Sequence, residues 1–224
     1  YCQRRGYAFQ IIDLRWGVNA EATLNQKTIE ICLEEVKRCC TQSPRPNFLL
    51  MIGERYGWIP LPSKIKKEEY EKLYHGCSDE DKTILDEWYK LDENVIGGEY
   101  YLKERMGKYK DDNNWSKTEN SLSDILVSAG KRCGFNSNKM LKFTSSATEK
   151  EIVEGLLSDN STASNVIAIF RNGYPAQDAD KKKIIDLRNR ISQKMTDTQC
   201  EDNLFELEYD ENYINRFSEK VKEL

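Results

Sequence analysis

The feature that most limits the fold is a short, continuous apolar run, Asn47–Gly53 (NFLLMIG), with turn-forming residues on both sides. The run is too short for a buried helix and lacks the alternation of a half-exposed strand, so it predicts a strand buried on both faces. A second run of this kind, Asn165–Arg171, lies far downstream. Two such strands favour an α/β fold with a parallel sheet and helices on both of its faces.

The rest of the chain continues this alternation of strands and helices. The predicted parallel core has four strands, of which the other two are Ala8–Arg15 (AFQIIDLR) and Leu204–Tyr209. A further strand is predicted at Met140–Thr144, and helices are predicted at Asn25–Cys40, Thr148–Leu157, Asp178–Met195 and Glu211–Leu224.

Charged residues dominate between residues 60 and 142, and no strand pattern is visible there. Polar helices are predicted at Glu68–Tyr74, Asp79–Leu91 and Ser116–Arg132, with a loop at Asp111–Asn114. We therefore expect residues 1–224 to form a single α/β domain with a mostly helical insertion at about 60–142. Tyr1–Arg5 resembles the last turn of a helix capped by Gly6, which predicts that the chain is part of a longer polypeptide and lacks that polypeptide's first strand.

Composition excludes several classes of function. Lys and Arg total 34 against 38 Asp and Glu, giving a formal charge of -4, which disfavours a dedicated nucleic-acid binder. No apolar run approaches the roughly 18 to 20 residues that cross a bilayer, so we expect no membrane association. The seven cysteines have no regular spacing and predict reduced thiols in a cytoplasmic protein.

The sequence also lacks the motifs of several metal and nucleotide sites. The single histidine, His75, rules out a multi-histidine metal site, and the chain contains no CxxC pair. No GxxxxGK[ST] sequence occurs, so the chain carries no P-loop of its own. We expect no metal and no bound cofactor.

Three loops are predicted at the carboxyl edge of the sheet, where doubly wound folds bind ligands, at residues 13–17, 53–58 and 145–151. Arg15 and Arg55 also have a structural interpretation, in which they form ion pairs with Asp13 and Glu54 rather than bind a ligand. The tryptophans of these loops, Trp16 and Trp58, would in the same way pack under the loops rather than stack on a base. The candidate ligand-binding residues are Asp13, Arg15, Trp16, Arg55, Tyr56, Ser146 and Thr148.

The third loop contains a helix-start signal, because Ser146 or Thr148 can cap a helix whose first turn holds Glu149 or Glu151. A capping box explains this pattern structurally. A carboxylate at the mouth of a crevice at the sheet edge would also stabilise the oxocarbenium-like state of N-glycosidic cleavage.

Several segments together resemble one family. The runs are IIDLRWGV (Ile11–Val18), ICLEEVKRC (Ile31–Cys39), NFLLMIGERYGWIPLP (Asn47–Pro62), ILDEWYKLDEN (Ile84–Asn94) and SATEKEI (Ser146–Ile152). They resemble, in order and over nearly the whole chain, the TIR-like domain of unknown function found at the N-terminus of STAND and NACHT NTPases.

This resemblance implies a flavodoxin-like or TIR-like fold with strand order 2-1-3-4-5. It also implies an effector or adaptor role in defence signalling, with an NTPase and oligomerisation module in the same parent chain and homo-oligomers on activation. The spacing Ser146-x-Thr148-x-x-Glu151 is similar to the catalytic loop of nucleoside deoxyribosyltransferases and to the glutamate helix of NAD-cleaving TIR domains, which implies Glu151 as the catalytic residue. The family's usual first strand and its Ser/Thr-rich loop have no counterpart in this sequence.

Three functions follow as alternatives. The domain cleaves NAD or a related nucleotide when assembled, it acts as a non-catalytic scaffold through homotypic contacts, or it is a freestanding nucleoside-processing enzyme. Exposure of Glu151 in a crevice beside Asp13 and Arg55 would favour chemistry, whereas a buried and paired Glu151 would favour the scaffold.

Overall fold

The computed structural model describes residues 4, 6, 8, 10–16, 18–43, 45–158, 162–173 and 178–223. Its main sheet contains β1 (Phe48–Ile52), β5 (Val166–Asn172) and β6 (Leu204–Glu208), in the order β1-β5-β6. Both strand pairs are parallel, with Leu50 opposite Ala168 and Ile169 opposite Phe205. The parallel α/β fold and three of its four predicted core strands are therefore confirmed.

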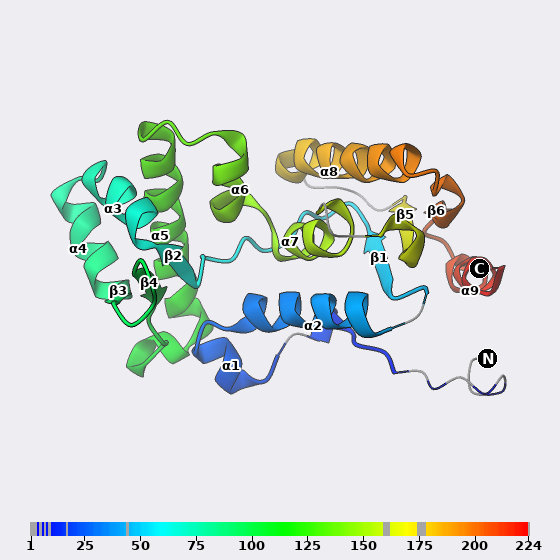
Figure 1. Ribbon diagram of the computed structural model, residues 1–224, viewed down its shortest axis with the longest axis horizontal. Helices are drawn as coiled ribbons and strands as arrows, with labels where there is room; N and C mark the ends of the chain where they lie inside the picture. The colour runs from blue at the N-terminus through cyan, green and yellow to red at the C-terminus, as the bar shows by residue number, and fades with distance from the viewer. Residues whose placement is uncertain are drawn as a thin grey trace.

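Helices cover both faces of this sheet (Figure 1). One face packs against α7 (Ala147–Ile152), the π-helix η4 (Val153–Leu157) and α8 (Asp178–Asp197), and the other face packs against α9 (Tyr213–Glu223). The long amphipathic helix α2 (Thr28–Gln42) lies against β1, α7 and η4. Because β5 is central, the side chains of residues 166–170 are all buried. Short 3-10 turns, η5 (Ala163–Asn165) and η6 (Glu201–Asn203), lead into β5 and β6.

The predicted strand at Ala8–Arg15 is wrong. Residues 8 and 10–13 have no regular structure, and a 3-10 turn, η2 (Leu14–Trp16), and the short helix α1 (Ala20–Leu24) follow them. Ile11 is 70% exposed, so this apolar segment is not buried as a core strand would be. A strand is stable only where a neighbour completes its hydrogen bonds, and among the described residues β1 pairs with β5 alone.

The charged region contains a second, antiparallel sheet, which contradicts the prediction that it holds no strand. Its strands are β2 (Lys64–Lys66), β3 (Tyr89–Asp92) and β4 (Glu99–Leu102), in the order β2-β4-β3. They are too short to show a clear period of two. Gly97 and Gly98, both with positive φ, form the turn between β3 and β4.

The helices of this region pack on one face of the small sheet, to the left in Figure 1. They are α3 (Lys67–His75), α4 (Asp79–Trp88), η3 (Gly107–Lys110), α5 (Asp112–Arg132) and α6 (Ser137–Thr144). They bury a hydrophobic cluster that includes Ile65, Tyr70, Leu85, Trp88, Leu122 and Phe143.

Two local predictions in this region are wrong for the same reason, a helix cap. Met140–Thr144 lies in α6 rather than in a strand, because the Asn136 side chain accepts a hydrogen bond from the Lys139 N–H at 3.0 Å and Phe143 points into the cluster. The predicted loop at Asp111–Asn114 is the start of α5, where Asp111 caps the Asn114 N–H at 3.0 Å.

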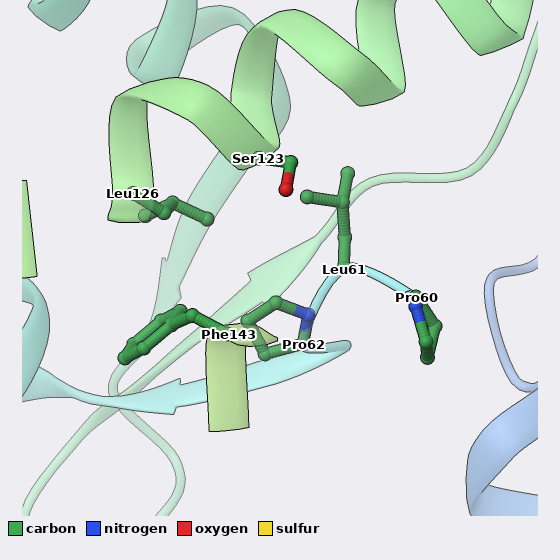
Figure 2. Close-up of a pocket in the computed structure, with 6 residues that line it drawn as sticks. All are labelled: Pro60, Leu61, Pro62, Ser123, Leu126 and Phe143. Carbon is green, nitrogen blue, oxygen red and sulfur yellow. The ribbon is translucent and has the colours of Figure 1, made fainter. Parts of the chain in front are cut away.

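The chain passes between the two hydrophobic clusters along residues 58–62 and again at 144–147. Figure 2 shows a small gap at this junction, lined by Pro60, Leu61, Pro62, Ser123, Leu126 and Phe143, which leaves no room for a water molecule. Trp58 also joins the two parts, because its indole N–H donates to Glu119 at 3.0 Å. Within the described residues, no helix is long and apolar enough to cross a membrane.

Candidate functional site

The start of α7 contains a buried polar cluster that includes two of the predicted site residues, Tyr56 and Ser146. Ser146 is fully buried and its hydroxyl accepts a hydrogen bond from the Glu149 N–H at 3.2 Å. This confirms Ser146 as the cap of the helix and places Glu149 in the first turn. In an ordinary capping box the glutamate side chain would accept a hydrogen bond from the Ser146 N–H.

In this structure the Tyr56 hydroxyl, rather than Glu149, accepts that hydrogen bond. It accepts from the Ser146 N–H at 3.2 Å and donates a hydrogen bond to the Glu149 carboxylate. Tyr56 lies in the loop after β1, so its phenol joins the carboxyl end of the sheet to the start of α7. The structure thus brings together Tyr56 and Ser146, two of the predicted ligand-binding residues.

Glu149 is only 4% exposed and is also paired with Arg190 of α8. Burial alone would raise the pKa of the Glu149 carboxyl, but hydrogen bonds from Tyr56 and Arg190 outweigh burial and lower it. The pKa of Tyr56 rises to about 12, because its phenol is buried and donates to Glu149. At neutral pH this cluster is therefore an ionised carboxylate held by two donors.

Two lysines surround the same cluster. The ammonium of Lys183 lies 4.6 Å from the centre of the Tyr56 ring. Lys150 donates to the Pro60 carbonyl at 3.3 Å, and burial lowers the pKa of its amine to about 8.

Glu151 points away from this cluster toward α2. It is half-buried, and burial raises the pKa of its carboxyl to about 7, although the neighbouring Cys32 thiol acts in the opposite direction. The pKa of Cys32 rises to about 11 through burial and the proximity of Glu151. The two hollows described for this chain do not include Glu151.

Asp13 and Arg15 pair with each other, as their structural alternative predicted. Arg15 donates to Asp13 at 2.6 Å, and its side chain is 80% exposed. The charge of Arg15 influences Tyr213 of α9, which packs on the sheet face opposite α7. The backbone of Trp16 belongs to η2, but its side chain lies outside the described residues.

Arg55 and Thr148 are both exposed. Glu54 lies 3.5 Å from Arg188 of α8, and among the described residues no ion pair joins it to Arg55, so the structural alternative expected for Arg55 is not observed. Arg188 also donates to the Arg171 carbonyl and the Asn172 side chain, both at 2.8 Å, and so joins α8 to the carboxyl end of β5.

The structure therefore brings only some of the predicted site residues together. Tyr56 and Ser146 meet, whereas Glu151, Arg15 and Arg55 do not converge on them. Sequence reasoning missed Arg190 and Arg188, which lie within an ordinary charged helix and give no local signal of their partners. Among the described residues, no three His, Cys, Asp or Glu side chains are grouped so that they would hold a metal ion.

Comparisons with known proteins identify relatives of part of the chain. It is 40% identical over 106 residues, 46% of its length, to "NACHT domain- and WD repeat-containing protein 1" of Homo sapiens. It is 28% identical over 109 residues, 47% of its length, to "NACHT and WD repeat domain-containing protein 2" of Mus musculus. About half of this chain is homologous to NACHT and WD repeat proteins.

The chain spans 7% and 6% of the lengths of these two relatives. A shorter match, 41% identical over 49 residues, links 22% of the chain to 2% of "Telomerase protein component 1" of Mus musculus. No family model matches the sequence, and no solved structure matches it.

Proposed function

We propose that this chain is a TIR-like signalling domain of a NACHT-containing STAND protein and acts through protein contacts when the parent chain assembles into homo-oligomers. Similarity of about half the chain to NACHT and WD repeat proteins supports the link to an NTPase module. The parallel α/β fold supports the TIR-like assignment, which also includes a role in defence. The cysteines of the described part are free, which supports the proposed cytoplasmic location.

This proposal rests on one observation: Glu149 and Glu151, the two carboxylates of α7, contact neighbouring elements of the fold. Glu149 is buried and held by Tyr56 and Arg190, so both of its oxygens already have partners. Glu151 faces α2 beside Cys32. These contacts tie α7 to the sheet and to two other helices, which favours a scaffold over a ligand-binding crevice.

Electrostatics of Glu151 support the same conclusion. A carboxylate that stabilises an oxocarbenium-like state must be ionised before the sugar bond breaks. With a pKa of about 7, the Glu151 carboxyl is partly protonated at neutral pH. Among the described residues, only the Cys32 thiol lowers the pKa of Glu151 and so favours its charged form.

One observation favours a second candidate, cleavage of NAD or a related nucleotide with Glu151 as the catalytic residue. Partly desolvated carboxyls with a raised pKa are concentrated at functional sites. Glu151 is such a group, and a π-helix, a feature frequent at functional sites, begins two residues later.

The test is an NAD and nucleoside cleavage assay on the intact parent protein with its NTPase module engaged. We expect no turnover above that of protein-free buffer. Turnover that is lost in Glu151→Gln and retained in Glu154→Gln would overturn the contact-only function and establish the second candidate. Glu154 is the matched control because its partly exposed carboxylate lies on the next turn, 3.8 Å from Lys37.

A further inference from the structure

The free edge of β1 is an incomplete part of the parallel sheet. Among the described residues, β1 pairs with β5 on one side, and no strand pairs with its other side. The helix α2 also contacts β1, but a helix does not complete the hydrogen bonds of a strand edge. The backbone N–H and C=O groups on that side therefore lack a strand partner and can receive one.

The two edge strands of this sheet differ in composition. On β6, the opposite edge, Glu206 and Glu208 are exposed, and charged side chains protect an edge strand from further pairing. On β1, all five residues (FLLMI) are apolar, and none is charged or a proline. This is the composition of an interior strand, so it predicts that another strand covers the edge of β1 in the complete molecule.

One face of β1 is also bare. Leu49 and Met51 lie opposite Ile167 and Ile169 of β5, and side chains of directly paired residues point to the same face of a sheet. The helix α9 covers Ile167 and Ile169, which are 3% and 0% exposed, whereas Leu49 and Met51 are 44% and 39% exposed. The apolar face therefore extends beyond α9 onto β1, where an occupant of the edge has apolar surface to bury.

Two occupants from this chain fit the edge poorly. A second copy of β1, paired antiparallel about Leu50 so that the exposed side chains of both copies meet, brings Arg45 toward Arg55. Both arginines are exposed, and like charges placed opposite each other destabilise strand pairing. Residues 10–15 contain a paired Asp and Arg whose charge acts on Tyr213 of α9, and they do not pair with β1.

We propose that a strand of the parent polypeptide upstream of residue 1 pairs with the free edge of β1, and that the chain following this strand covers Leu49 and Met51. Gly6 supports this occupant, because its φ of 82° is the left-handed conformation that commonly ends a helix. A helix that ends there would return the chain from the added strand. The relatives are long enough to supply both, since this chain spans only 7% and 6% of their lengths. The inference rests on the longer parent chain of the proposed function.

The added strand is parallel to β1. Strands of one sheet that are connected through helices pair in parallel, as β1, β5 and β6 do. Parallel strands end at the same edge of a sheet, so the loop after the added strand lies beside residues 53–58. These residues include Arg55 and Tyr56, so the upstream segment would form a further wall of the ligand-binding edge predicted from the sequence.

The experiment compares hydrogen exchange of residues 47–53 in the intact parent protein and in the 224-residue protein. We expect exchange about tenfold slower or more in the parent, because the added strand accepts hydrogen bonds from the amides on the free edge. Deletion of the parent residues upstream of residue 1 should restore the faster exchange. Residues 204–208, at the opposite edge, are the internal reference, and their exchange should not change with this deletion.

A matched pair of variants tests the covered face. Met51→Asp places a carboxylate under the proposed cover, so we expect it to accelerate exchange of residues 47–53 about fivefold more in the parent than in the 224-residue protein. Ile214→Asp makes the same kind of change at a position of α9 that is 67% exposed, and its effect should be equal in both proteins. An equal effect of Met51→Asp in both proteins would exclude a cover on this face.

Three further outcomes would overturn the added strand. Equal exchange of residues 47–53 in all forms would show that nothing covers the edge. Protection that survives the upstream deletion would assign the cover to another segment or to a partner protein. Concentration-dependent protection in the 224-residue protein would replace the upstream strand by a second copy. These readouts do not depend on turnover, so this proposal and the proposed function can fail separately.

Discussion

The Tyr56 hydroxyl connects three elements that are distant in the sequence. It accepts from the backbone of Ser146 and donates to Glu149, which in turn binds Arg190. Tyr56→Phe removes the bridge while keeping the ring, and leaves a buried N–H without an acceptor. We expect the free energy of unfolding in urea to fall by about 1–3 kcal/mol. Thr148→Ala, at an exposed position of the same turn, should change it by less than about 0.5 kcal/mol.

Glu151 should make stability depend on pH in the opposite direction from Glu149. The folded-state pKa of Glu151, about 7, exceeds the value of about 4.3 in an unfolded chain, so the folded protein binds more protons between these values. Its contribution is therefore complete below about pH 4.3 and is lost as the pH rises through 7. Glu149, whose pKa is lowered, instead stabilises the folded protein above about pH 4.3, and this contribution is lost as the pH falls further and the carboxylate is protonated.

Glu151→Gln removes the ionisation and should flatten this dependence. Relative to the wild type, we expect the variant to gain about 1–2 kcal/mol between pH 5 and pH 8 in urea unfolding, a range that allows for the partial exposure of Glu151. A constant difference between Glu151→Gln and wild type at all pH values would contradict the raised pKa.

Sequence patterns predicted the cap at this site but not its partners. The Ser-x-x-Glu spacing is local, so the order of residues alone indicated Ser146 or Thr148 as the cap and Glu149 or Glu151 in the first turn, and the structure selects Ser146 and Glu149. The donors to Glu149 are 93 and 41 residues away in the sequence. Which of the two glutamates is buried depends on the rotation of α7 against the sheet, and tertiary packing sets that rotation.

Among the elements, the π-helix η4 packs closely against β1 at Gly155. A Cβ atom added at Gly155 would lie 2.6 Å from the Phe48 ring, a separation that real side chains do not show. We expect Gly155→Ala to lower the free energy of unfolding by about 1–3 kcal/mol despite the better helix propensity of alanine. Adding Phe48→Leu should restore part of the loss, and strict additivity of the two changes in a double-mutant cycle would contradict this contact.

Long, strongly patterned elements were predictable, and short ones were not. The helix α2 and the strand β5 followed from their patterns, an amphipathic period for α2 and continuous burial for β5. The strand β1 was also predicted, but its expected burial on both faces is wrong, because Leu49 and Met51 are 44% and 39% exposed on one face. The strands β2, β3 and β4 have three or four residues each, too few for alternation to be visible. Ala8–Arg15 has the composition of a strand, yet composition cannot supply the neighbouring strand that pairing requires.

The whole molecule contains separate hydrophobic clusters, one around the small sheet and its helices and the others on the two faces of the parallel sheet. Several polar contacts connect the two parts. They include the Trp58–Glu119 hydrogen bond at 3.0 Å and the Lys64–Glu30 ion pair at 2.7 Å. Exposed pairs of this kind contribute little to stability, so the expected single domain should contain two regions that open separately.

Hydrogen exchange with two matched cavity variants tests this division. Leu122 in α5 and Leu187 in α8 are both nearly fully buried, one in each part, and replacement of either by alanine should cost about 3 kcal/mol. We expect Leu122→Ala to reduce the protection of amides in α3, α4 and α5 while leaving β1 and β5 as protected as in the wild type. Leu187→Ala should give the reverse pattern. An equal loss of protection in both parts from either variant would show one cooperative unit, in which the junction at residues 58–62 transmits stability as well as connecting the chain.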